Sequence, residues 1–268
     1  MTLQLLLDTI LLGLVEGITE FLPVSSTGHL ILVDDLLGFS GPPGKVFEIV
    51  IQLGAILAVC VLYFRKLLGV LVGLPSDPQA RRFTLNLLWA FLPAAVVGLL
   101  AHGFIKSVLF SPWVVSVSLI VGGILILVIE RVRPQPVYRD VDDLPAIVAL
   151  KIGCAQVVSM IPGVSRAGAT IMGAMMFRVD RATAAEFSFF LAIPTMVAAT
   201  AYDVYKNRAA LTLDDAQVIA IGFVVAFVSA LIVVRWLIGF ISRHGFGPFA
   251  WYRIMVGALM LGILISRS

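Results

Sequence analysis

The chain has 268 residues, of which 60% are hydrophobic and only 13% are charged. A soluble domain carries about 25% charged residues, so the composition excludes a soluble globular protein and indicates one integral membrane domain over residues 1–268. The net charge of +3 is spread over short loops, so no nucleic-acid partner is expected. The first residues lack a basic leader and a small-residue cleavage site, so we expect no signal peptide.

The N-terminal region is apolar but interrupted. Leu3–Leu22 ends at Pro23 and the polar turn Ser25–His29. The following stretch, Leu30–Phe39, is too short to cross a bilayer of ~30 Å. Irregular backbone is tolerated at lipid depth only where protein or a water-filled cavity surrounds it. We therefore expect a re-entrant helical hairpin; the alternative is that Leu3–Leu22 spans the membrane fully.

Six later blocks approach or exceed the ~17–25 apolar residues that a spanning helix needs. These predicted spans are Val46–Phe64, Phe83–Ala101, Trp113–Ile129, Phe187–Tyr202, Ala216–Ile241 and Phe249–Ile265. Between the third and the fourth lies a second interrupted region. Leu144–Ile161 is broken at Pro162 and Gly163, and the apolar sequence resumes over Ala167–Phe177. We expect a second re-entrant hairpin here.

The two halves match at a constant offset of 140 residues, which for example takes Ser25 to Ser165. A constant offset over most of the half-length indicates a duplicated unit, placed at about residues 1–130 and 144–268. A hairpin followed by three spans ends on the opposite side from its start, so the second unit must be inverted. The expected fold is an all-α integral membrane protein with an inverted-topology repeat. Each unit would be a re-entrant helical hairpin plus three transmembrane helices, with the hairpin tips meeting near the midplane.

Loop charges orient this arrangement, because basic residues favour the cytoplasmic side. The larger basic set is Arg65, Lys66, Arg81, Arg82, Arg131, Arg133, Arg139, Arg178, Arg181 and Arg243. The opposite side has Lys45, Lys106, Lys206, Arg208 and Arg267. Assigning the larger set to the cytoplasm places both termini outside, with the first hairpin entering from the outside.

The first hairpin carries two carboxylates. Glu16 and Glu20 are four residues apart and would share one helix face. Two carboxylates in a low-dielectric site repel each other unless a cation or a proton lies between them. Hard cations such as Mg²⁺ are held by one or two carboxylates plus phosphate oxygens. We predict a divalent-metal or proton site; the alternative is a pair at a wet interface.

The turn after the carboxylates would begin the returning half-helix, whose N-terminus favours an anion. Substrate binding is assigned to Ser25, Thr27 and Gly28, because three hydroxyls exceed what a helix cap needs. Ser26 could attack phosphorus if a base or metal activates it, and His29 could move protons near neutral pH. The alternative for His29 is an ordinary buried histidine.

The second tip supplies a cation. Arg166 follows Ser165, and a guanidinium matches phosphate bidentately and keeps its charge. We predict that both residues hold a phosphate; Arg166 could equally be a counter-ion for the acidic pair. Gln156 stands where the first repeat has Glu16 and would supply an amide to the substrate.

Other polar residues are weaker candidates. Glu48 and Gln52 begin the first full span and are left open as cavity residues. His102, His244 and Arg253 are expected at the membrane interface, where polar side chains reach water.

These motifs resemble those of a known family. Glu-Gly-Ile-Thr-Glu-Phe-Leu-Pro-Val-Ser-Ser-Thr-Gly-His at 16–29, with Pro-Gly-Val-Ser-Arg-Ala-Gly at 162–168, resembles the undecaprenyl-pyrophosphate phosphatases of the bacitracin-resistance type. The resemblance covers essentially the whole chain. It implies hydrolysis of undecaprenyl diphosphate to the monophosphate, recycling the lipid carrier of cell-wall synthesis. It also implies a bacterial inner-membrane location with the site facing the periplasm.

The resemblance implies roles by position. The family's acidic pair matches Glu16 and Glu20, its nucleophile Ser26, its proton-transfer residue His29 and its phosphate-binding arginine Arg166. The expected cofactor is a divalent cation, Mg²⁺ or else Ca²⁺. The expected partners are the polyprenyl diphosphate and the bilayer, while a homodimer is left open. Whether Ser26 attacks or positions a water is also open.

Two rival functions remain. Inverted repeats with broken helices are also a transporter architecture, in which the carboxylates would bind a coupling ion and Arg166 an anionic headgroup. The protein would then be a transporter or flippase for an anionic lipid or small anion. Membrane phosphatases of the acid-phosphatase type need a second histidine after Ser-Arg. Neither His102 nor His244 has a suitable spacing.

Overall fold

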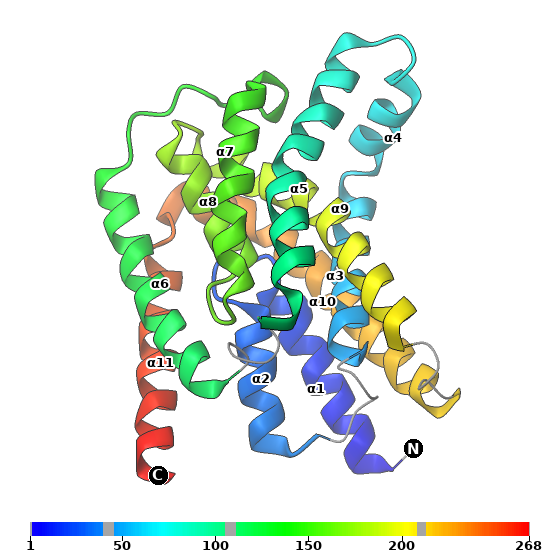
Figure 1. Ribbon diagram of the computed structural model, residues 1–268, viewed down its shortest axis with the longest axis vertical. Helices are drawn as coiled ribbons and strands as arrows, with labels where there is room; N and C mark the ends of the chain where they lie inside the picture. Colours follow the sequence, from blue (N-terminus) through cyan, green and yellow to red (C-terminus); the bar gives the residue numbers. More distant parts are fainter. Residues whose placement is uncertain (1, 40–45, 105–110, 208–212, 268) are drawn as a thin grey trace.

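The computed structural model describes residues 2–39, 46–104, 111–207 and 213–267, and within these ranges it is helical (Figure 1). The helices are α1 Leu3–Thr19, α2 Ser26–Leu37, α3 Val46–Leu62, α4 Phe64–Gly73, α5 Pro78–Phe104, α6 Pro112–Val132, α7 Ala146–Val157, α8 Arg166–Met176, α9 Arg181–Asn207, α10 Leu213–His244 and α11 Gly247–Arg267. Short 3₁₀ turns cover Val141–Asp143 and Val158–Met160. Lys45, Lys106, Arg208 and the side chain of His102 lie outside the described residues.

Both interrupted regions fold as broken helical pairs, as predicted. α1 ends at Thr19, before Leu22, and both the re-entrant course of this hairpin and the alternative of a full span stay predictions. α2 and α8 are each capped by a serine, Ser25 and Ser165, whose φ angles are 73° and 74°. Each cap hydroxyl accepts the N–H of the glycine three residues later. The two tips thus share a backbone conformation that residues other than glycine rarely adopt.

Five of the six predicted spans are confirmed, because α5, α6, α9, α10 and α11 are long and apolar enough to cross a membrane. The sixth prediction is partly wrong. α3 stops at Leu62, and the chain turns by 77° into α4 instead of continuing through Phe64. Lys66 on α4 donates to Asp142 at 2.9 Å, so the bend leaves this cation paired beside a polar loop. Counted as one bent segment, α3 and α4 bring the candidate spans among the described residues from five to six.

The two halves have the same order of elements, a hairpin followed by long helices. Each hairpin packs on a helix of the other half, α1 on α10 and α7 on α5. These approaches are close: a Cβ atom at Gly153 would lie 2.3 Å from Ala90 O. α1 and α2 lie in the lower half of Figure 1, and α7 and α8 in the upper half. The orientation of each repeat in a membrane, and the repeat bounds, stay predictions.

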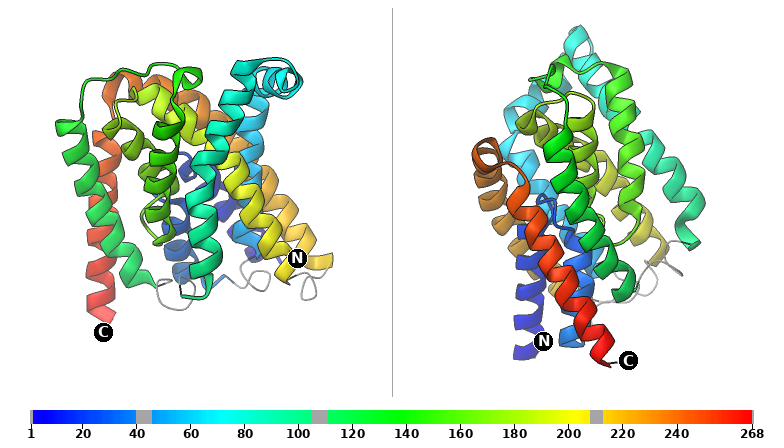
Figure 2. Two further views of the ribbon diagram at one scale, coloured as in Figure 1. Left: turned by 45° about the horizontal axis from the view of Figure 1, so that its top comes forward. Right: turned by 90° about the vertical axis from the view of Figure 1, so that its left-hand side faces the viewer.

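One end of the bundle is tied together by charged side chains. Glu130 at the end of α6 pairs with Arg181 at the start of α9, and its carboxylate accepts the N–H of Phe246 at 2.8 Å. α1 begins and α11 ends at the opposite end of the bundle (Figure 2). The end of the bundle that contains Glu130 and Arg181 is therefore opposite the end where α1 begins and α11 ends.

Candidate active site

The hairpin tips meet, and an arginine from α11 binds both. Arg253 Nη1 donates to Pro23 O of the first tip and to Val164 O of the second, both at 2.9 Å. Its Nη2 donates to Gly163 O, also at 2.9 Å. One guanidinium therefore binds the backbone of both tips and helps to fix their relative position.

The prediction that Arg253 lies at the membrane interface is wrong. The residue is 1% exposed, and its guanidinium lies in a slot beside Gly122, where a Cβ atom would be 2.0 Å from Nη2. The guanidinium also donates to Ser118 O and Leu119 O of α6. Carbonyls at the broken helices supply the polar partners that water would supply at an interface. The available sequence signal was a charge inside a predicted span.

Glu20 joins the two tips chemically. Its Oε1 accepts from Arg166 Nη2 at 2.9 Å, and its Oε2 accepts from Ser26 Oγ at 2.5 Å. All three side chains are buried. Arg166 Nη1 also donates to Ser188 O at 2.8 Å, which fixes the guanidinium against α9. Arg166 is thus the counter-ion of Glu20, and its Nε retains a free N–H.

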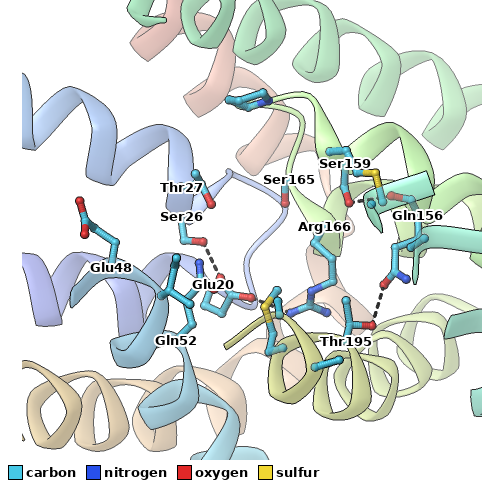
Figure 3. A pocket seen from close by; sticks show the side chains of 18 of the residues that line it. Glu20, Ser26, Thr27, Glu48, Gln52, Gln156, Ser159, Ser165, Arg166 and Thr195 are labelled. Carbon is cyan, nitrogen blue, oxygen red and sulfur yellow. Dashed lines mark hydrogen bonds and ion pairs between the residues drawn. The ribbon is translucent and has the colours of Figure 1, made fainter. Parts of the chain in front are cut away.

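This group lines a cavity of about 460 Å³ (Figure 3). The predicted site residues that line it are Glu20, Ser25, Ser26, Thr27, Gln156, Ser165 and Arg166. Glu48 and Gln52, left open from sequence, also line it. One wall is apolar and comes mainly from α5, with Phe91, Ala94, Ala95, Gly98 and Leu99.

Sequence reasoning missed other polar residues of the cavity, namely Ser159, Thr195, Tyr202 and Asp203. Ser159 lies in the second tip, so the polar interruption there was its signal. Thr195 follows Pro194 inside α9, and an isolated threonine in an apolar span carries no signal of its own.

Three predicted residues do not line the cavity: Glu16, Gly28 and His29. Gly28 donates its N–H to Ser25 Oγ at 3.2 Å and so helps to form the tip. Glu16 is 0% exposed and has Glu20 as a neighbouring carboxylate. Neither carboxylate oxygen of Glu16 has a hydrogen-bond partner.

His29 is turned toward α11. Its Nδ1 lies 2.8 Å from Ser25 O and its Nε2 2.9 Å from the hydroxyl of Tyr252, on whose ring it stacks. A carbonyl oxygen only accepts, so Nδ1 carries the hydrogen. His29 therefore supports the backbone of Ser25, and its role in proton transfer stays a prediction.

The carboxylates of Glu16 and Glu20 are chemically suited to bind a cation. Across the part of the chain that the structure describes, no three His, Cys, Asp or Glu side chains gather as a metal site. Two adjacent carboxylates suffice for Mg²⁺ when phosphate oxygens complete its shell. The unpartnered oxygens of Glu16 are buried polar atoms that a cation or a proton would satisfy.

Comparison with known proteins decides the family. A sequence model described as "Bacitracin resistance protein BacA" matches residues 9–259. The chain belongs to the BacA family. It is 56% identical to undecaprenyl-diphosphatase 2 of Paramagnetospirillum magneticum, over 98% of this chain and 100% of the relative. It is 54% identical to undecaprenyl-diphosphatase 1 of Agrobacterium fabrum, over 98% of both chains. With an undecaprenyl-diphosphatase of Cereibacter sphaeroides the identity is 53%, over 99% of both.

The family match and the helical fold both bear on whether the protein lies in a membrane. The family model and the named relatives match almost the full length of this chain, and its described residues contain five apolar helices of spanning length plus the bent pair. This BacA family member is therefore a multi-pass membrane protein.

Proposed function

We propose that this protein hydrolyses undecaprenyl diphosphate to undecaprenyl phosphate and inorganic phosphate, recycles the lipid carrier of cell-wall synthesis and confers bacitracin resistance. One observation carries the proposal. Ser26 donates to a carboxylate that Arg166 holds from the opposite hairpin, in a cavity with a polar end and an apolar wall. Relatives named undecaprenyl-diphosphatase, more than half identical to this chain, support the same reaction.

Glu20 is the proposed base, because its Oε2 already accepts the proton of Ser26 Oγ. Ser26, or a water that it positions, attacks the terminal phosphorus, and the bond from that phosphorus to the bridging oxygen breaks. The lipid monophosphate leaves with that oxygen. In the serine route, water then hydrolyses the phosphoserine to inorganic phosphate. Arg166 stabilises negative charge on the transferred group.

Charge balance supports a divalent cation, Mg²⁺ or Ca²⁺. Among the described residues that line the cavity, Arg166 is the sole cation, and Glu20 already pairs with it. A diphosphate adds further negative charge. We propose that Glu16 and Glu20 hold the cation together with phosphate oxygens. When bound, the ion would neutralise charge on the diphosphate.

Chelation is expected to abolish turnover, and added Mg²⁺ to restore it. In Glu16→Gln we expect the metal concentration for half-maximal activity to rise by about 10- to 100-fold, because one charged ligand is lost. Titrations of phosphate release against metal concentration measure this. A wild-type rate that is unchanged by chelator, or a Glu16→Gln titration like that of wild type, would contradict the proposed site.

The cavity is proposed to open to the periplasm of the bacterial inner membrane. Its lining includes Glu48 near the start of α3, Leu99 near the end of α5 and Asp203 near the end of α9. These helix ends lie toward the end of the bundle where α1 begins and α11 ends (Figure 1). The basic set lies toward the other end, where α5 begins and α6 ends. The positive-inside rule then places the opening outside.

The prenyl tail is proposed to follow the α5 wall toward lipid. Gly98 lines the cavity, and a Cβ atom there would meet a single neighbour, the flexible end of Met160, at 3.3 Å. Gly98→Phe is expected to raise KM for prenyl diphosphates by about 10-fold, since it fills the path of the tail. Isopentenyl diphosphate, with its short tail, should be much less affected. Gly239→Phe on α10 is the control, because this position lies outside the cavity and has nothing within 4 Å of its Cβ position. Equal effects in both variants would disprove the path.

Phosphate release from a prenyl diphosphate by the purified protein in detergent tests the function. Wild-type release that is lost in Arg166→Ala is the expected result. A transporter would release no phosphate, because a detergent micelle offers no second compartment. If the folded protein releases no phosphate, the proposed hydrolysis is wrong.

A further inference from the structure

The polar end of the cavity has two sides. Ser26 and Glu20 lie on one side of the Arg166 guanidinium, and Gln156 and Thr195 lie on the other (Figure 3). The mechanism proposed above uses only the first side. A diphosphate has two phosphoryl groups, so the use of the second side needs an explanation.

Gln156 is 1% exposed and lies at the end of α7. Its Oε1 lies 3.5 Å from Thr195 Oγ1, a hydroxyl that also donates to Leu191 O at 2.8 Å, so the amide nitrogen is the end of the side chain farther from Thr195. Nε2 is buried and has no hydrogen-bond partner. An unsatisfied buried donor is costly, and a ligand that accepts from it recovers that cost.

Arg166 presents a second donor of the same kind. Its Nη1 is committed to Ser188, and its Nη2 to Glu20. Its Nε is buried without a partner. Ser159, the neighbouring hydroxyl, already donates to Gln156 O at 2.6 Å, so it has no proton left for a ligand. The unpartnered groups on this side are therefore donors, and the matching ligand is an anion with acceptor oxygens.

The predicted repeat relates Gln156 to a residue of different chemistry in the first half. Gln156 occupies the position that corresponds to Glu16 in the first half. A carboxylate there can only accept and suits a cation, whereas an amide donates and suits a phosphate oxygen. The two positions are thus suited to ligands of opposite charge.

We propose that Gln156 Nε2 and Arg166 Nε form a subsite for the second, lipid-linked phosphoryl group, while the terminal group lies beside Ser26. The inference rests on the proposed hydrolysis. It makes Gln156 a specificity residue, because a diphosphate fills both subsites and the monophosphate product fills one. The product is then held less tightly than the substrate.

Binding of two non-hydrolysable probes tests the subsite: a C15 prenyl methylenebisphosphonate, with two phosphoryl groups, and a C15 prenyl phosphonate, with one. Calorimetric titration of purified protein in detergent gives both affinities. Gln156→Leu is expected to weaken bisphosphonate binding by about 10-fold or more, the scale of one charged hydrogen bond. Phosphonate binding should change by less than about 2-fold, because its single phosphoryl group lies beside Ser26 and makes no contact with Gln156. Gln156→Glu should weaken the bisphosphonate further, because like charges repel.

Asn86→Leu is the matched control. Asn86 is another buried amide, 1% exposed, which donates to Leu144 O and does not line the cavity. If Gln156→Leu fails to fold, Thr195→Val, which removes the hydroxyl bonded to Gln156, should weaken the bisphosphonate selectively. Equal loss for both probes, no loss, or the same loss in Asn86→Leu would each overturn the subsite. If wild type binds the bisphosphonate through Gln156 yet releases no phosphate, hydrolysis fails and the subsite stands.

Discussion

Glu20→Gln is expected to lower kcat by about 10³-fold, in the range that general-base catalysis supplies. The substitution removes the acceptor of the Ser26 proton and the charge that pairs with Arg166. Breaking a buried ion pair from one side also costs about 3–5 kcal/mol in stability. Phosphate release and thermal unfolding in detergent, measured together, separate the two effects.

The control for this variant is Asp8→Asn. Asp8 is a buried carboxylate on the same helix, α1, and accepts from Gln4 Nε2 at 2.8 Å. Its loss should leave kcat within a factor of about three, because Asp8 does not line the cavity and the substitution disturbs one hydrogen bond, worth about 1 kcal/mol. Near-normal turnover in Glu20→Gln would rule out Glu20 as the base.

Arg253→Lys is expected to lower kcat by about 10²-fold, the effect of misplacing reacting groups by about 1 Å. An ammonium has three donors on one atom and cannot bind carbonyls of both tips as the guanidinium does. KM should change less than kcat, because Arg253 does not line the cavity. Steady-state kinetics with a prenyl diphosphate measure the split.

An independent variant checks the same contact. Gly122→Ala keeps the arginine but places a Cβ atom 2.0 Å from Nη2, so it should reproduce the loss in kcat. Gly262→Ala on α11, with nothing within 4 Å of its Cβ position, is the control. Full activity in Arg253→Lys would show that the tips keep their position without the guanidinium.

The hairpins and spans were predictable because run length and breakers are local properties of the sequence. Pro23 and Gly163 interrupt apolar runs at places where the structure also breaks its helices. The bend after Leu62 was not predictable, because the apolar run continues through Phe64. A partner for Lys66 appears only at Asp142, far along the chain.

The same distinction holds for the site. Glu20, Ser26 and Arg166 could be found because polar groups at lipid depth stand out. Arg253 was misplaced because the carbonyls that bind it, such as Pro23 O and Val164 O, lie far away in the sequence. The turn of His29 toward Tyr252, 223 residues away, depends on packing that no local pattern encodes.

The pairing of Glu20 with Arg166 across the two tips has a consequence for the evolution and dissection of the protein. The first half contains the Ser26 hydroxyl and its base, Glu20, and the second half contains the guanidinium of Arg166. A fragment ending near residue 130 would therefore bury an uncompensated carboxylate. If the two halves arose by the predicted duplication, a single ancestral unit would have needed a second copy of itself to complete this pair.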